Sequence, residues 1–241
     1  MRRNLFYCTW DEAAEVIPQS EGILLLLGSV EEHGYHLPLG TDVLLAHDFA
    51  EAVCEKEDMY YYPCIPYGQT WSARGFEGTI GISKPALCAY CMEAAENLIS
   101  MGAKKVILFS FHKGNFEVMN DIVRAFKERG TDIYKIQIKK GEGVAKKELK
   151  TPVWEDRIWH AGELETSLML YLHRDLVRME KATAEFPEKP EKYEVAAVPW
   201  RDFVKSGAFG DARAADAETG KKVFELFCRD LLEQVKTIKG I

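Results

Sequence analysis

The segment GSVEEHGYHLPLGTD gathers acidic and imidazole side chains directly after the apolar run Ile23–Leu27. Glu31, His33 and Asp42 carry the oxygen and nitrogen atoms that divalent metals such as Zn²⁺, Mn²⁺ or Fe²⁺ take as ligands. Glu31 and His33 are two residues apart, so an extended backbone points both side chains to the same side. The glycines and the proline that follow favour turns that return Asp42 to the same point. The segment therefore predicts part of a metal site, and other segments must supply the missing ligands.

Two other segments offer suitable side chains. VILFSFHKGNFE is an apolar run that leads to His112 and Lys113 in a tight turn. IWHAGELETS places His160, Glu163 and Glu165 at the start of an expected helix, where the helix dipole favours a carboxylate. Three distant segments thus carry imidazole or carboxylate groups that a metal could use.

Hydrophobic periodicity defines the elements that must position these residues. Short, predominantly apolar runs at 23–28 and 106–111 predict buried central strands, and 60–65 and 133–138 predict two more. A capping box at Thr9 and Glu12 opens a helix that is expected to end at Pro18. Asp42 is expected to cap the next helix. Further helices are predicted over 84–101, 115–129, from about 162, and 216–235, with an exposed segment at 139–152.

The alternation of strands and helices predicts an α/β fold. We expect a single three-layer α/β/α domain over residues 1–241, with a mainly parallel central sheet. Ligands of such sheets bind beyond the carboxyl ends of the strands. Glu31 and His33 follow one predicted strand and His112 follows another, so we expect these side chains to converge.

The composition excludes several classes of protein. A formal net charge of −7 over 241 residues argues against a nucleic-acid-binding surface. No apolar run approaches the roughly 18 residues of a membrane span, and the first residues lack the apolar region of a signal peptide. The six cysteines do not imply disulfides, and Cys88 and Cys91 are interpreted as packing residues on one helix face. We therefore predict a cytoplasmic protein that binds neither nucleic acid nor membrane.

These motifs resemble those of the creatininase family of metal-dependent amidohydrolases. The HAGELETS segment matches one family hallmark in full, while Ser110–Asn115 matches a second only in part. The C-terminal GAFGDARAADAETG resembles the closing segment of the family. The first hallmark is matched by Gly28, Ser29, Glu31, His33, Gly34, His36, Leu37, Pro38, Thr41 and Asp42.

The resemblance implies two divalent metal ions per chain, either zinc, manganese or iron. Glu31 and His112 would hold one ion and His33 the other, with Asp42 bridging both. In creatininase a glutamate two residues after the histidine of the second motif completes the site. Gly114 stands at that position here, so we expect Glu165 to take its place, with Glu163 as the next choice.

Such a centre has a defined chemistry. Two cations that share a hydroxide lower its pKa to near neutral, and one of them polarises a substrate carbonyl. His160 would carry a proton to the leaving nitrogen, and Glu165 would act beside it. Trp159, together with Trp154, could wall a flat ring substrate, or either could lie at an interface.

We expect hydrolysis of a C–N amide bond in a small cyclic or formylated compound by a metal-bridged hydroxide. Lys113 would bind an anionic or hydroxylated group. The loop SARGFEGT departs from the family pattern, which argues against creatinine as the substrate. One alternative is hydrolysis of a C–C bond in a keto-inositol ring, with Lys113 and Arg74 on its hydroxyls. Another alternative is a non-catalytic family member with an incomplete metal site, because Gly114 stands where a metal ligand is expected.

Two further expectations concern residues and partners. His36 is interpreted as a structural histidine that bonds nearby backbone, and Glu32 as solvated or supporting. The resemblance also implies a homo-oligomer, possibly a hexamer, whose partner in catalysis is a small-molecule substrate.

Overall fold

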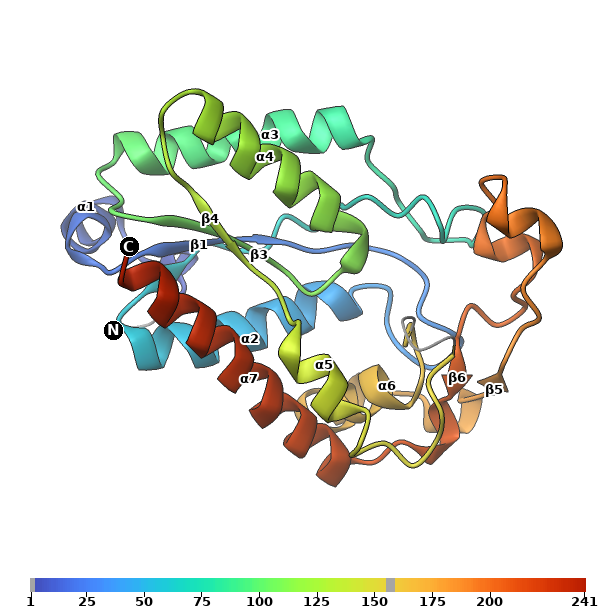
Figure 1. Ribbon diagram of the computed structural model, residues 1–241. Helices are drawn as coiled ribbons and strands as arrows, with labels where there is room; N and C mark the ends of the chain where they lie inside the picture. Colours follow the sequence, from blue (N-terminus) through green and yellow to red (C-terminus); the bar gives the residue numbers. More distant parts are fainter. Residues whose placement is uncertain (1–2, 155–158) are drawn as a thin grey trace.

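A computed structural model describes residues 3–154 and 159–241 of the chain (Figure 1). Four strands form a central sheet in the order β2-β1-β3-β4, and every neighbouring pair is parallel. In the central pair, Ile23 lies opposite Val106 and Leu27 opposite Ser110. The strands are β1 (Ile23–Leu27), β2 (Tyr60–Tyr61), β3 (Val106–Ser110) and β4 (Tyr134–Ile136).

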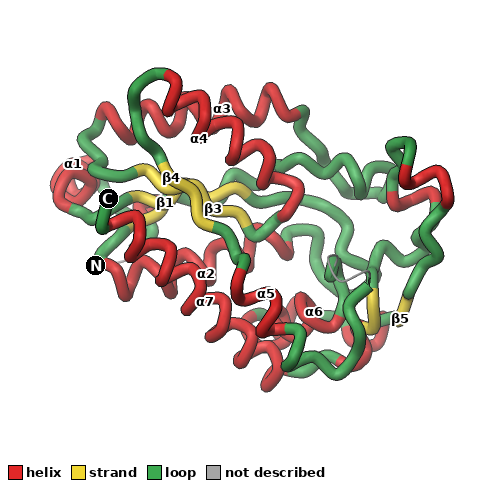
Figure 2. The backbone as a smooth tube through the Cα atoms, viewed as in Figure 1, coloured by secondary structure: helices red, strands yellow, loops and turns green. Residues whose placement is uncertain are grey.

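Helices cover both faces of this sheet (Figures 1 and 2). The face shown uppermost is covered by α3 (Lys84–Ser100) and α4 (Phe116–Glu128), and Ile17 of α1 (Trp10–Gln19) packs into the same core cluster. The opposite face is covered by α2 (Thr41–Glu57), α5 (Lys140–Ala145), α6 (Glu163–Leu172) and α7 (Ala217–Lys239).

The residues of β1 alternate between these two helical layers. Leu25 and its neighbours two positions away pack toward α3 and α4, whereas Leu24 and Leu26 pack toward α2 and α7. All five residues of β1 are buried. A strand covered on both faces has no polar side, which is why its sequence is a continuous apolar run. The predicted three-layer α/β fold is confirmed.

The ends of α1 and β2 differ from the sequence-based expectation. The helix α1 continues through Pro18 to Gln19, and the backbone N–H of Ser20 closes it on the carbonyl of Val16. The strand expected over 60–65 is only two residues long, because Pro63 has no N–H to donate to the ladder. Pairing resumes as a single bridge between Ile65 and Leu27.

The segment 139–152 is not simply an exposed loop. It contains α5, whose last residue Ala145 is fully buried in the core cluster shared with α7. Ile138, just before α5, is buried in the same cluster, so apolar residues at both ends of this helix hold it against the protein.

Two short strands lie outside the main sheet. β5 (Ala184–Glu185) and β6 (Gly210–Asp211) pair antiparallel near α6 (Figure 1). All six cysteines are free thiols. Within the described residues, no helix has the length and apolar character required to cross a membrane.

Candidate metal centre

The predicted ligands lie just beyond the carboxyl ends of β1 and β3. Glu31 and His33 occupy the loop after β1, and His112 follows β3. Asp42 lies in the first turn of α2. Glu165 lies in the first turn of α6. Each of these five side chains belongs to a residue that is less than a tenth exposed, so the fold encloses carboxylates and imidazoles together.

Asp42 does not cap α2 as the sequence predicted. Gly40 is the N-cap residue, and a glycine has no side chain that could accept a hydrogen bond from the first N–H groups. The carboxylate of Asp42 instead turns toward the carboxyl ends of β1 and β3, and its Oδ2 accepts a 2.6 Å hydrogen bond from the hydroxyl of Ser29, just after β1. The same oxygen lies 2.9 Å from His112 Nδ1. Tertiary contacts have therefore taken this side chain away from the helix end.

Two groups of possible metal ligands share Asp42. Glu31 Oε1 lies 3.3 Å from His112 Nδ1, and Asp42 completes this first group. In the second group, His33 Nε2 lies 3.8 Å from both Asp42 Oδ1 and Glu165 Oε2. The two oxygens of Asp42 thus face different histidines, as a bridging carboxylate would. A third group of suitable spacing combines Glu31, His33 and His160.

The hydrogen bonds of the histidines fix which ring nitrogen faces the carboxylates. His33 Nδ1 lies 3.1 Å from the carbonyl of Glu31, and His112 Nε2 lies 2.7 Å from the carbonyl of Gln69. Because a carbonyl only accepts, these nitrogens must carry the hydrogen, which leaves the opposite nitrogen of each neutral ring with a lone pair. In both rings that opposite nitrogen faces carboxylates. This arrangement is typical of metal-binding histidines, whose other nitrogen donates to a carbonyl or carboxylate.

One buried atom tests directly whether a cation fits. His33 Nε2 is buried and has no hydrogen-bond partner among the described residues. A lone pair facing two carboxylates without a proton between them is unfavourable in a buried site. A divalent cation among the three atoms removes this conflict, so the residues present fit such an ion.

The pKa values of the cluster show that its groups compete for protons. Burial raises the pKa of Glu31 to about 7, against the opposing effect of His112 and His160. Burial also raises the pKa of Glu165 to about 7 and lowers the pKa of His33 to about 4. Burial alone would lower the pKa of His112, but Glu31 and Asp42 outweigh it and raise that pKa to about 9. Divalent cations bind the deprotonated forms, so they would replace these shared protons.

Gly114 leaves no room for a ligand of its own. A Cβ atom at this position would collide with the carbonyl oxygen of Gln69 and with the ring of His112. The oxygen of Glu165 that faces His33 also accepts a 2.6 Å hydrogen bond from the N–H of Ala161. Glu165, and not Glu163, therefore points into the cluster. The carboxylate of Glu163 instead accepts hydrogen bonds from the N–H groups of Lys150 and Thr151.

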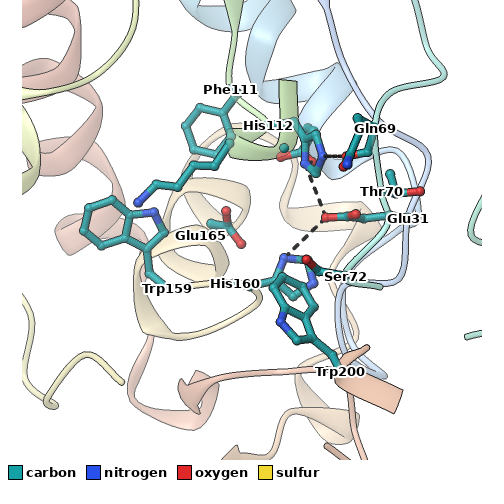
Figure 3. A pocket seen from close by; sticks show the side chains of 13 residues that line it. Glu31, Gln69, Thr70, Ser72, Phe111, His112, Trp159, His160, Glu165 and Trp200 are labelled. Atoms are coloured by element: carbon teal, nitrogen blue, oxygen red, sulfur yellow. Dashed lines mark hydrogen bonds and ion pairs between the residues drawn. The ribbon is translucent and has the colours of Figure 1, made fainter. Parts of the chain in front are cut away.

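His160 lies at the edge of the cluster, and Glu32 fixes the orientation of its ring. Its Nε2 lies 2.8 Å from the carbonyl of Glu32 and 3.0 Å from the carboxylate of the same residue. Both are acceptors, so Nε2 carries a hydrogen and Nδ1 faces Glu31 Oε1 at 3.6 Å. Figure 3 shows Glu31 between His112 and His160. Glu32 is buried, so it supports His160 and is not solvated.

A cavity of about 280 Å³ opens onto these groups. In Figure 3 Trp159 and Phe111 lie across it from Gln69 and Thr70, and Trp200 lies beside His160. The ring centroids of Trp200 and His160 are 4.8 Å apart. The lining residues are Glu31, Asp42, Gln69, Thr70, Ser72, Phe111, His112, Lys113, Gly114, Trp159, His160, Glu165 and Trp200.

Two of the three predicted substrate-binding residues, Lys113 and Trp159, line this cavity. Arg74 does not; it is exposed, and its guanidinium lies 5.3 Å from the ring centroid of Trp71. Trp154 packs against Phe209 in a separate core cluster, so only Trp159 of the two predicted tryptophans reaches the cavity. The first correction arises because the loop around Arg74 turns its side chain outward. The second arises because the aromatic cluster at Phe209 buries Trp154.

Sequence reasoning missed Trp200 and the polar wall at Gln69, Thr70 and Ser72. The N–H of Trp200 donates a 2.7 Å hydrogen bond to the carbonyl of Ser72, which brings two distant loops together. No local sequence pattern predicts the contact between these two loops. The one sequence feature that could have indicated Trp200 is that it is a large aromatic residue in a polar loop. His36 is buried as a structural histidine, but it bonds the hydroxyl of Thr166 at 2.8 Å and not nearby backbone.

Comparison with known proteins agrees with this geometry. A family model described as creatinine amidohydrolase matches residues 7–235, and the chain belongs to this creatininase family of hydrolases. It is 25% identical to the creatinine amidohydrolase of Pseudomonas putida, with 95% of this chain and 94% of that protein covered. It is 26% identical to the mycofactocin precursor peptide peptidase of Mycolicibacterium smegmatis, over 89% and 84% of the two chains. It is also 26% identical to the 3-dehydro-scyllo-inosose hydrolase of Thermotoga maritima, over 75% and 59%.

Solved structures share the fold over nearly the whole chain. A mutant creatininase of the Zn-Zn type superposes with a TM-score of 0.86 at 22% identity, and 98% of each chain is covered. A creatininase with manganese gives a TM-score of 0.80 at 21% identity, again over 98% of each chain. The family therefore contains zinc and manganese members, and this chain has a buried candidate site for two metal ions.

Proposed function

We propose that this chain is a metal-dependent hydrolase that cleaves a C–N amide bond in a small cyclic or formylated compound. Residues 1–241 would form that single hydrolase domain. The observation that carries the proposal is that one ring nitrogen of His33, of His112 and of His160 faces buried carboxylates while the other ring nitrogen is held by a backbone carbonyl.

In this proposal Glu31, Asp42 and His112 hold one divalent ion, and His33, Asp42 and Glu165 hold the other. Zinc, manganese and iron are all compatible with imidazole and carboxylate ligands. When bound, such ions supply Lewis acidity, which polarises a carbonyl group and makes water more acidic. Glu165 takes the place of the ligand that Gly114 cannot provide.

His160 would move the proton that hydrolysis requires. The reaction forms a bond between a water oxygen and the carbonyl carbon, breaks the C–N bond, and leaves one more hydrogen on the nitrogen. With metal bound, His160 Nδ1 would take the proton from water and give it to the leaving nitrogen. Glu32 and its carbonyl hold Nε2, so the ring keeps Nδ1 toward the cavity throughout.

Trp159 and Trp200 would hold the substrate. Both line the cavity, and a flat ring can stack on an indole face without needing directional hydrogen bonds. The cavity of about 280 Å³ suits a small ring and excludes a large ligand.

Zinc- or manganese-loaded protein should be incubated with cyclic amides and N-formyl amines in ¹⁸O-labelled water. Mass spectrometry should find ring-opened or deformylated products with one labelled oxygen on the former carbonyl carbon. His160→Gln should lower kcat by about 10²- to 10⁴-fold while the protein keeps its metal. His173→Gln is the matched control, because His173 pairs with Asp48 away from the cavity. Full activity in His160→Gln would contradict the assigned role.

A second candidate is C–C hydrolysis of a keto-inositol ring, which the similarity to the Thermotoga maritima hydrolase favours. The same assay with keto-inositols separates the two, since only one class of compound should react. A non-catalytic protein is the third possibility, and metal analysis decides it. Two equivalents of metal per chain support an enzyme, and none after reconstitution supports a scaffold.

A further inference from the structure

The backbone of Gln69 is held on both sides beside the candidate metal centre. Its N–H donates a 2.9 Å hydrogen bond to Oδ1 of the buried Asn115. Its carbonyl oxygen lies 2.7 Å from Nε2 of His112, which supplies the hydrogen between them. Figure 3 shows Gln69 next to His112, on the wall across from Phe111 and Trp159. The position of Gln69 is therefore tied to the position of a predicted metal ligand.

The side-chain amide of Gln69 is oriented as well. One of its two polar atoms lies 3.2 Å from the backbone nitrogen of Trp71, and because an N–H only donates, that atom is the oxygen Oε1. The other polar atom is then the NH2 group. Among residues 3–154 and 159–241, no group accepts a hydrogen bond from it. Gln69 is half-buried and lines the cavity, so this NH2 group is a donor fixed in place before a ligand arrives.

This donor lies close to where the amide must react. Glu31 and Gln69 contact the two nitrogens of the same His112 ring, Glu31 at 3.3 Å and the Gln69 carbonyl at 2.7 Å. In a cavity of about 280 Å³, a small ring whose amide lies near Glu31 and His160 also reaches the Gln69 wall. An NH2 group only donates, so the ring atom that it meets should be an acceptor. A ring without an acceptor there would strip the donor of water and leave it unpaired, which costs binding free energy.

We infer that the substrate is a cyclic imide or ureide, a ring whose reacting amide nitrogen also carries a second carbonyl group. Gln69 selects it by donating a hydrogen bond from its NH2 group to that second carbonyl oxygen. This inference rests on the proposed amide hydrolysis and adds the class of ring and a specificity-determining residue. Water supplies the oxygen that stays on the reacting carbon, and the C–N bond breaks. The nitrogen gains a hydrogen and remains bonded to the second carbonyl carbon, so the product is an acid with an amide or urea group.

Glutarimide and 2-piperidinone test the second carbonyl alone. Both are six-membered rings, and they differ only in that glutarimide has a C=O group where 2-piperidinone has CH2. Calorimetric titration of zinc-loaded protein measures the Kd of each ring without requiring turnover, and product analysis measures kcat/KM for glutarimide. The wild type should bind glutarimide about 3- to 10-fold more tightly than 2-piperidinone, as one hydrogen bond predicts.

Two substitutions of Gln69 separate selection from a structural role. Gln69→Met removes the donor, so it should abolish most of the preference and lower kcat/KM for glutarimide by a similar factor. Gln69→Glu keeps an oxygen for the Trp71 N–H but turns the group that faces the ligand into an acceptor, so it should lower glutarimide binding further. Thermal unfolding and metal content should stay close to the wild type in Gln69→Glu, since its contact with Trp71 remains.

Gln19→Met is the matched control. Gln19 is an exposed residue of α1, which precedes β1 and therefore lies at the opposite end of the sheet from the cavity (Figure 1). Its replacement should leave the preference for glutarimide unchanged.

The outcomes separate this inference from the proposed function. Equal binding of the two rings, no binding of either, or a preference that persists in Gln69→Met overturns the inference, and hydrolysis of other amides still stands. Gln69-dependent binding of glutarimide without ring opening supports the selection and overturns the proposed reaction on such rings. Ring opening with a Gln69-dependent preference supports both.

Discussion

His33 Nε2 lies 3.8 Å from Glu165 Oε2, although the two residues belong to distant segments of the chain. This separation is too long for a hydrogen bond. It is close to the spacing of about 3.4 Å between ligand atoms that surround a tetrahedral zinc ion at about 2.1 Å. The pair is therefore arranged for a cation between its members, which leads to the first prediction.

Removing ligands should change the metal content in steps. Wild-type protein should bind about two equivalents of zinc or manganese, as a two-metal site requires. Glu165→Gln should bind about one, because only the second group loses a ligand. Asp42→Asn should bind less than either, because both groups share Asp42. Elemental analysis and calorimetric titration measure these values.

His36→Gln is the control for this series. His36 is a buried histidine of the same loop, but it bonds Thr166 and belongs to none of the three candidate groups. It should keep the wild-type metal content. If Glu165→Gln binds as much metal as the wild type, and as tightly, Glu165 is not a ligand.

Gly114→Ala should damage the site without removing any polar group. The added methyl would overlap the Gln69 carbonyl and the His112 ring, so the His112 hydrogen bond to that carbonyl must break or shift. We expect a loss of about 1–3 kcal/mol in the free energy of unfolding, together with weaker metal binding. Urea unfolding with and without metal tests both. Gly143→Ala, at an open position in α5, should cost nothing or stabilise slightly, and an equal effect at both glycines would contradict the packing argument.

Asn115→Asp should loosen three segments around the site. The side chain of Asn115 is fully buried; its Nδ2 donates to the Gly28 carbonyl at 2.9 Å, and its Oδ1 accepts from the Gln69 N–H at 2.9 Å. Aspartate removes the Nδ2 donor and buries either an unpaired charge or a protonated acid. The free energy of unfolding should therefore fall by about 2–4 kcal/mol. Asn97→Asp, on the exposed side of α3, should change stability by less than about 0.5 kcal/mol. Chemical denaturation of the two variants compares them.

The N-cap of α7 should give a pH-dependent contribution to stability. Asp216 accepts hydrogen bonds from the N–H groups of Glu218 and Thr219 and pairs with Lys150 at 2.5 Å. Lys150, followed by the Thr219 N–H, holds the pKa of Asp216 well below its usual range. Because the folded-state pKa is depressed, the stabilisation is complete above the unfolded-state pKa of about 3.9 and is lost as the pH falls below it.

Asp216→Ala should therefore cost about 1 kcal/mol at pH 7 and clearly less at pH 3. Asp216→Asn should cost less than alanine at pH 7, since asparagine still caps the helix and only the partly exposed pair with Lys150 is lost. Unfolding in urea at both pH values gives these differences. A penalty for alanine that is the same at both pH values would show that charge plays no part in the cap.

Local patterns predicted the elements that local interactions control. The five buried residues of β1 form an apolar run because helices cover both faces of the strand, and this reads directly from the sequence. The same holds for the position of Glu31 and His33 just past that strand. Patterns failed where a tertiary partner competes with a local one: Asp42 leaves the end of α2 for Ser29 and His112. The prediction that Arg74 binds substrate also failed, because a loop has no periodicity from which the direction of a side chain can be predicted.

The sequence by itself determined the layered α/β fold, the family, and the residue types able to bind metal, because all of these depend on residue identity and spacing along the chain. Only the tertiary structure decided that Glu165 faces His33 while Glu163 fixes the backbone of Lys150 and Thr151. It also decided that Trp200 joins Trp159 at the cavity. These choices depend on how distant loops pack against one another, and the free energy of that packing is shared among contacts that no single segment contains.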